Sequence, residues 1–165
     1  MKTKRKTEVE GVLELFQPWG EIIVESGKIR IVPDLQQSES LEEGVVYLWV
    51  QCTSRRAKGS YFVRYVGRAN KTFKLRASQH VAGLNNDVSI KAAFIRKILT
   101  TTNDKLLVYV RCSKKTNPFK GIIESQIKVS VSYVEEVFLI RYFKELYNDL
   151  PKQKQLWNEQ RKPSA

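Results

Sequence analysis

The sequence predicts an α/β (α+β) domain in which a mixed or antiparallel three-stranded central sheet is flanked by helices and preceded by an N-terminal β-hairpin. Segments rich in β-branched residues alternate along the chain with segments of helical periodicity, an order typical of small mixed domains. The length of 165 residues allows one domain with one core, because two domains would each be marginally stable. With 42% hydrophobic and 28% charged residues, the composition is typical of globular rather than disordered chains.

Two hairpins are predicted in the first half of the chain, after a polar tail that reaches about residue 10 and that we expect to be loose. Their four strands are expected at residues 21–24, 29–32, 45–52 and 61–66. The turn Ser26-Gly27-Lys28 separates the first pair, and the basic segment 53–60 separates the second pair. The apolar run 45–52 shows no alternation, which indicates a strand buried on both faces. The polar, acidic residues 34–43 predict a connecting loop.

The second half of the chain is mainly helical. Helices are expected at residues 72–82, 89–101 and 132–147. Ser89 is placed to cap the second helix, and Ser132 opens the third. The apolar segment 106–112 predicts the third central strand, followed by a basic loop at 113–124. Pro151 and a segment rich in lysine and glutamine follow the third helix and lead to Leu156-Trp157-Asn158-Glu159.

The positive charge of the chain is concentrated in one region. There are 29 Lys and Arg residues against 17 acids, for a net charge of +12. Residues 51–120 contain 16 of the basic residues and only two acids, so this stretch alone carries +14. Charge concentrated in this way attracts a polyanion, most often a nucleic acid. A solvated basic surface without a partner is the alternative, but its self-repulsion would cost stability.

Several functional classes are excluded by simple counts. The longest apolar run is residues 45–50, too short to span a bilayer, and the basic N-terminus is not followed by the apolar segment of a signal peptide. Two cysteines and a single histidine are too few for a conventional structural zinc site. We therefore expect a cytoplasmic protein with reduced thiols and no membrane partner.

Two carboxylates, Glu135 and Glu136, fall inside the apolar arc of the 132–147 helix. Glu135 has a structural explanation, because Ser132-Tyr-Val-Glu135 fits a capping box. Glu136 has none, and an inward carboxylate is costly unless it is paired or coordinated. It could form a salt bridge, or it could bind a hard cation such as Mg²⁺ that takes its other oxygen ligands from substrate phosphates.

Six ordered motifs give a more specific indication. The hairpin carries Val45-Val46-Tyr47 on its first strand and Tyr65-Val66-Gly67-Arg68 on its second. Arg76 follows in the next helix with His80 one turn later, and Glu136 and Trp157-Asn158 come at the end of the chain. In this pattern the chain resembles the GIY-YIG nuclease family over residues 44–158. The resemblance implies a nuclease domain at 44–165 with basic DNA-binding insertions, and it leaves residues 1–43 as an arm and hairpin of the same unit.

The resemblance also implies the roles of the tyrosines and their basic neighbours. Tyr47 would be the general base or would position the attacking water, with Tyr65 helping through its hydroxyl. Because a free tyrosine is a poor base at neutral pH, neighbouring cations would have to lower its pKa. Arg76 would hold a phosphate oxygen, and His80 would assist proton transfer or bind phosphate. Whether Tyr47 or His80 takes the proton stays open.

The remaining implied roles concern the metal and the closing asparagine. Glu136 would bind a single divalent ion, Mg²⁺ with Mn²⁺ as a substitute, and Glu135 is the alternative ligand. Asn158 would connect the parts of the site by hydrogen bonds, and Asn148 is the rival for this position. Candidate DNA-binding residues are Arg55, Arg56, Lys58, Arg68, Lys71, Lys91, Lys114 and Lys115, with Lys120 in the same loop as the last two.

Together, these expectations predict that the protein is a divalent-metal-dependent endonuclease that hydrolyses phosphodiester bonds in double-stranded DNA. Without a separate recognition domain, the chain resembles compact type II restriction endonucleases of the family, which would act as homodimers on palindromic DNA. A phage-type degradative endonuclease with relaxed specificity is the first alternative. A nucleic-acid-binding module without catalysis is the second, and it explains the charge equally well.

Overall fold

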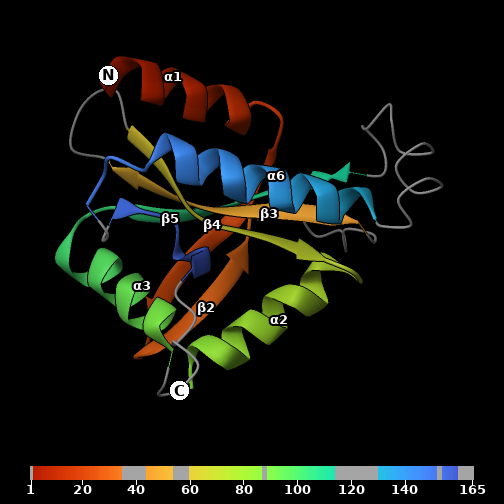
Figure 1. The fold of residues 1–165 in the computed structure, drawn as a ribbon. Coiled ribbons are helices and arrows are strands. Elements are labelled where there is room, and N and C mark those ends of the chain that lie inside the picture. The colour runs from red at the N-terminus through yellow and green to blue at the C-terminus, as the bar shows by residue number, and fades with distance from the viewer. Residues whose placement is uncertain are drawn as a thin grey trace, which may run out of the picture.

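The protein is a mixed α+β structure in which one antiparallel sheet lies between two layers of helices (Figure 1). The computed structural model describes residues 2–34, 44–53, 60–86, 89–113, 130–151 and 154–159. The expected fold class is confirmed. Most of each predicted basic or acidic loop, namely residues 35–43, 54–59 and 114–129, lies outside the described residues.

The sheet has five strands in the order β2-β1-β5-β3-β4. Their bounds are β1 Gln17–Glu25, β2 Lys28–Pro33, β3 Val45–Thr53, β4 Ser60–Ala69 and β5 Lys105–Cys112. The three expected central strands and the N-terminal hairpin are present, but they differ in detail from the expectation, because β1 pairs with β5 and makes one five-stranded sheet. All four pairings are antiparallel, so the sheet is not mixed. In the turn between β1 and β2, Ser26 and Gly27 both have positive φ, at 50° and 76°.

Strand β3 lies inside the sheet and is buried on both faces, as its unbroken apolar run predicts. Alternate side chains enter different cores, because successive residues of a strand point to opposite faces. Val45, Tyr47 and Trp49 belong to one core, and Val46, Leu48 and Val50 belong to the other. The side chain of Tyr47 therefore lies in the first core.

The helices divide between these two faces. The helices α2 (Phe73–Leu84) and α3 (Ile90–Thr101) and the short 3₁₀ helix η2 (Trp157–Glu159) supply the core that contains Tyr47. The helices α1 (Lys2–Leu13) and α6 (Val131–Leu146) supply the other (Figure 1). The hydroxyls of Thr72, Ser89 and Ser130 cap α2, α3 and α6 by accepting hydrogen bonds from backbone N–H groups.

Two local expectations were wrong. The N-terminal residues form α1 rather than a loose tail, because Val9 and Leu13 are buried against the sheet and Arg5 Nε donates a 3.0 Å hydrogen bond to the carbonyl of Leu146. The last helix is capped by Ser130, not by Ser132. Glu135 therefore does not close a capping box.

None of the helices in the described part of the chain is long and apolar enough to cross a membrane. Neither Cys52 nor Cys112, both in the described part of the chain, is in a disulfide.

The two-core architecture predicts that substitutions of two phenylalanines in α6 differ in their effect on the free energy of unfolding. Phe143 is fully buried, so Phe143→Ala should lower the free energy of unfolding by about 3–5 kcal/mol through lost contacts and a cavity. Phe138 is 64% exposed, so Phe138→Ala should change it by less than about 0.5 kcal/mol. Urea denaturation of both variants tests this, and similar losses for the two would contradict the packing of α6.

Candidate active site

A cluster of polar and aromatic side chains lies between β3, β4 and α2. The Tyr47 hydroxyl is hydrogen-bonded to Nε2 of His80 and accepts a 3.4 Å hydrogen bond from Nε of Arg76. The Tyr65 ring lies 6.1 Å from the Tyr47 ring and 5.6 Å from the His80 ring, measured between centroids. Four residues that the sequence separates by up to 33 positions thus meet in one cluster.

Gly67 is required by the closeness of these tyrosines. A Cβ atom at this position would lie 2.8 Å from Cε1 of Tyr65, and closer still to Cζ and the hydroxyl of Tyr47. Any side chain at position 67 would therefore push the Tyr47 hydroxyl away from His80 and Arg76. This is the physical reason for glycine at the end of the Tyr65-Val66-Gly67 motif.

Asn158 is the asparagine that reaches this hairpin. Its Oδ1 accepts a 2.9 Å hydrogen bond from the N–H of Val66, and its Nδ2 donates a 2.6 Å hydrogen bond to the carbonyl of the same residue. Both backbone groups lie on the outer side of β4, the edge strand. Asn148 instead lines a separate pocket with Tyr147 and Leu156. Of the two asparagines, Asn158 is therefore the one whose side chain bonds to the hairpin.

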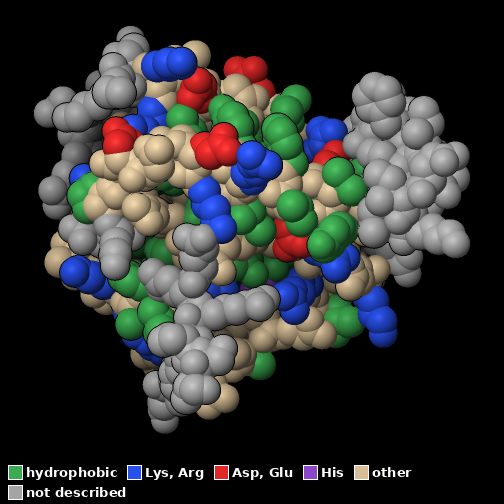
Figure 2. Space-filling model, in the orientation of Figure 1, with side chains coloured by type: hydrophobic (Ala, Val, Ile, Leu, Met, Phe, Trp, Pro, Cys, Tyr) green, Lys and Arg blue, Asp and Glu red, His purple; other side chains and the backbone are tan. Residues whose placement is uncertain are grey.

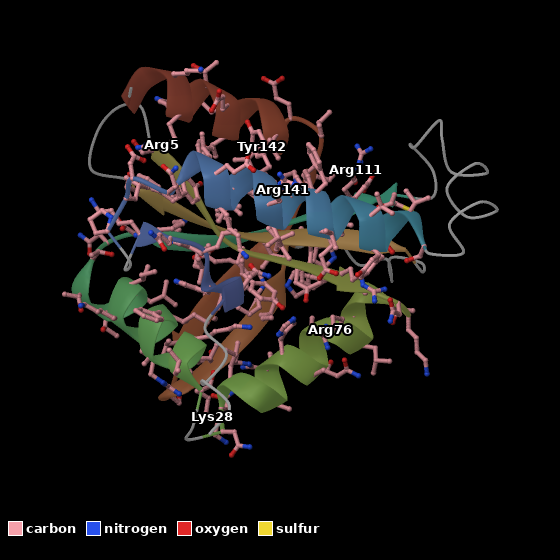
Figure 3. All side chains as sticks on the ribbon, viewed as in Figure 1. Arg5, Lys28, Arg76, Arg111, Arg141 and Tyr142 are labelled. Atoms are coloured by element: carbon pink, nitrogen blue, oxygen red, sulfur yellow. The ribbon has the colours of Figure 1, made fainter. Side chains whose placement is uncertain are left out.

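A cleft of about 450 Å³ opens beside this cluster, between the end of β4, the start of α2 and α6. It is lined by Arg68, Asn70, Lys71, Thr72, Leu75, Arg76, Gln79 and Glu136. Arg76 lies between α2 and the sheet (Figure 3) and also contacts Tyr47, so it separates the cleft from the fully buried tyrosine. The lining has three cations and one acid, and the N-terminus of α2 adds its positive dipole end.

Glu136 enters this cleft from α6, and Glu135 does not line it. The Glu136 carboxylate forms a 3.0 Å ion pair with Nε of Arg68, so the salt bridge that the sequence allowed is present. Burial raises the pKa of Glu136, and Arg68 and Arg76 only partly offset this effect. Glu135 instead accepts hydrogen bonds from Ser113, at 2.5 Å, and from Arg111, at 3.4 Å.

The predicted DNA-binding residues separate into three groups. Arg68 and Lys71 line the cleft. Lys91, on the first turn of α3, places its ammonium 4.2 Å from the centroid of the Tyr65 ring, a cation–π contact. Arg55, Arg56, Lys58, Lys114, Lys115 and Lys120 lie outside the described residues.

The electrostatics of the cluster differ from the sequence expectation. Burial, with a further contribution from Tyr65, raises the pKa of Tyr47 well above its ordinary value, and Arg76 does not overcome this effect. Burial together with Arg76 and Lys91 lowers the pKa of His80 to about 3. His80 is therefore neutral at pH 7. In the neutral imidazole one ring nitrogen donates and the other accepts, so the tautomer of His80 decides which partner donates in its hydrogen bond with Tyr47.

This cleft offers a divalent ion only a few protein ligands. Among the described residues, no group of three or more His, Cys, Asp or Glu side chains could hold a metal. One half-buried carboxylate, Glu136, faces the cleft, beside the neutral oxygens of Asn70 and Gln79. This donor set fits an Mg²⁺ ion that takes most of its ligands from water and phosphate oxygens, because Mg²⁺ needs only one or two carboxylates there.

Sequence reasoning missed three polar residues of the cleft: Asn70, Thr72 and Gln79. Gln79 accepts a 3.1 Å hydrogen bond from Nη1 of Arg76 and so helps to orient the guanidinium. A helical wheel places Gln79 one turn after Arg76, which was the available indication.

Comparison of the chain with protein-family models, with curated proteins and with solved structures finds no match.

The low pKa of His80 predicts an acid-sensitive fold. The pKa falls from 6.5 in the unfolded chain to about 3 in the folded one, so the unfolded state binds more protons between these values. Stability is complete above about pH 6.5, and the free energy of unfolding should fall by about 2 kcal/mol between pH 7 and pH 5. Urea denaturation of the wild type and of His80→Gln measures this effect, which the variant should lack. Because His80 is the single histidine, its ring resonances give the pKa directly, and titration near 6.5 would contradict the site.

The hydrogen bonds of Asn158 predict that two similar variants differ strongly in stability. Asn158→Asp replaces the Nδ2 donor by an oxygen that faces the Val66 carbonyl, so it should cost about 2 kcal/mol or more. Asn148→Asp serves as the matched control and should cost less than about 0.5 kcal/mol. Thermal unfolding compares the two, and equal losses would show that Asn158 does not hold β4.

Proposed function

We propose that the protein is a divalent-metal-dependent endonuclease that hydrolyses phosphodiester bonds in double-stranded DNA, with the sequence specificity of a type II restriction enzyme. The observation that carries the proposal is the Tyr47 hydroxyl, which contacts both His80 and Arg76 directly behind a cationic cleft. One hydrogen-bond partner would satisfy a buried tyrosine hydroxyl, whereas Tyr47 has both a histidine and an arginine. The resemblance to GIY-YIG nucleases supports the same assignment, because its motif residues converge here.

The proposed substrate contacts follow from the charges of the cleft. Arg68, Lys71 and Arg76 would bind the phosphates, and Arg76 would hold the oxygens of the scissile group. The backbone N–H groups at the start of α2 would add to this attraction. Bound phosphate would draw Arg76 towards the cleft and so open access to Tyr47.

The proposed proton pathway uses the Tyr47–His80 hydrogen bond. Tyr47 would orient the attacking water and accept its proton while passing its own proton to neutral His80. A bound phosphate would offset the positive field of Arg76 and Lys91, which makes His80 a better acceptor in the complex than in the free protein. The high pKa of free Tyr47 argues for this shared role and against a pre-ionised tyrosinate.

Glu136 would hold the Mg²⁺ ion, or Mn²⁺ in its place. When bound, the ion supplies Lewis-acid stabilisation of charge on the leaving oxygen. The ion would compete with Arg68 for the carboxylate, and Arg68 would then be released towards the phosphates. A homodimer would place two such sites on the two strands of a palindrome.

A non-catalytic nucleic-acid-binding module is the second candidate function. The ion pair between Glu136 and Arg68 and the complete burial of Tyr47 favour it, because both give these residues a purely structural role. A degradative endonuclease with relaxed specificity would share the proposed chemistry and differ only in its products. A digest of large unmodified DNA with Mg²⁺ separates these cases, because they give discrete fragments, a smear, or intact DNA that is still bound.

The proposed role of Glu136 predicts a loss of cleavage without a loss of binding. Glu136→Gln should lower the cleavage rate on the order of 100-fold, because metal binding needs the charge. Its affinity for DNA, measured without metal, should stay within about threefold, since DNA does not require this acid. Glu145→Gln is the matched control on the same helix: Glu145 is 69% exposed and should tolerate the change. Equal cleavage by both variants would contradict the endonuclease.

A further inference from the structure

A second groove lies at the opposite end of β4 from the cleft. It has a volume of about 330 Å³ and is lined by Arg5, Lys6, Ser60, Tyr61, Phe62, Leu150 and Lys154. Its character differs from that of the cleft, because its lining combines two aromatic residues and a leucine with three cations. Such a combination complements a nucleic acid, which presents anionic phosphates beside flat apolar groups.

The start of α1 provides a second, independent argument. Its first five residues, Lys2–Lys6, contain four cations, and its first turn contains no acid. Cations are unfavourable at this end of a helix, where the dipole is already positive. Within the helix, the ion pair from Lys6 to Glu10 offsets this effect only in part, so a negatively charged partner at this end of α1 would be favourable.

The neighbouring acids pre-position two of the cations and leave the third available. Arg5 pairs with Asp149 at 2.5 Å, and Lys6 pairs with Glu10 at 3.6 Å. Both acidic side chains are exposed, at 47% and 42%, so solvent screens these pairs and a phosphate can replace them. Lys154 forms no ion pair within the described part of the chain.

The groove and the cleft lie along one edge of the molecule. Strand β4 is the edge strand, and it runs from the groove beside the N-terminal end of α1 to the start of α2 (Figure 1). From Tyr61 to Arg68 the strand covers about 23 Å at a rise of about 3.3 Å per residue. This length equals about seven base pairs of B-DNA. Figure 2, in the same view, shows Lys and Arg side chains spread over this face, with Asp and Glu side chains among them.

We propose that the groove at the start of β4 binds the same DNA duplex as the cleft, about seven base pairs from the scissile phosphate. The inference rests on the proposed function for the identity of the polyanion. Lys6 and Lys154 contact backbone phosphates, and Tyr61 and Phe62 contact the sugars between them. The duplex therefore runs parallel to β4, outside the Asn158 segment that covers the edge of this strand.

The test uses DNA of two lengths in the absence of metal. A hairpin stem of about six base pairs is too short to reach both sites, whereas a duplex of about 20 base pairs spans them. The variant Lys6→Gln with Lys154→Gln should bind the long duplex about tenfold more weakly than wild type and reduce the salt slope of binding by about two. Its affinity for the short stem should be unchanged. Fluorescence anisotropy measures all four affinities.

The matched control removes two charges elsewhere. Lys28 and Lys97 are both exposed outside the groove and the cleft, and Lys28 lies at the opposite end of the molecule from Arg5 (Figure 3). Lys28→Gln with Lys97→Gln should bind the long duplex within about threefold of wild type. A gain-of-charge variant, Ser60→Arg, should bind the long duplex more tightly, which keeps the test independent of any loss of stability.

Each outcome has a defined meaning. Equal affinities of the groove variant and the control for the long duplex would overturn the second contact. An equal loss on both DNA lengths would also overturn it, because the groove would then not be distant from the cleft. In either case, cleavage by wild type with Mg²⁺ would leave the endonuclease standing. Failure of wild type to bind either DNA would instead remove the proposed function, and the second contact with it.

Discussion

Strand β3 has a helical layer against each of its faces, so every one of its side chains from Val45 to Gln51 must be matched by a packed neighbour. This constraint determines where the candidate site can form. Tyr47 is held within the α2 core, and its hydroxyl must find partners there because a buried hydroxyl without them is costly. His80 and Arg76 supply those partners from two turns of one helix. Packing and polar satisfaction thus produce the geometry that chemistry would use.

The sequence predicted most of the fold, because its strongest patterns were local. The unbroken apolar run of β3, the capping of α3 by Ser89 and the arc of α6 were all confirmed. The association of β1 with β5 was missed, since pairing between strands distant in the chain leaves no local pattern. Helix α1 was missed because its core contribution depends on few residues, such as Val9 and Leu13, among many charges.

The sequence named most of the residues that the fold brings together, but it did not predict their pKa shifts. The resemblance to the GIY-YIG motifs associated Tyr47, Tyr65, Arg76 and His80, and the fold brings these four side chains together. Burial was not predictable from spacing, and burial dominates the pKa of both Tyr47 and His80. The cleft residues Asn70 and Thr72 were missed because polar residues at a helix start are common, and Gln79 was missed although it lies one turn after Arg76.

The segment that carries Asn158 closes the edge of the sheet from outside. Leu156 enters the core of α1 and α6, Trp157 enters the core of α2 and α3, and Asn158 bonds to Val66 between them. These residues follow every other described element in the order of synthesis. During translation, β4 therefore remains an open edge, and the Tyr47 cluster lacks its Trp157 backing, until this segment leaves the ribosome. The packing around Tyr47 is therefore completed only after this segment has folded against the sheet, as a late step that depends on all the earlier elements.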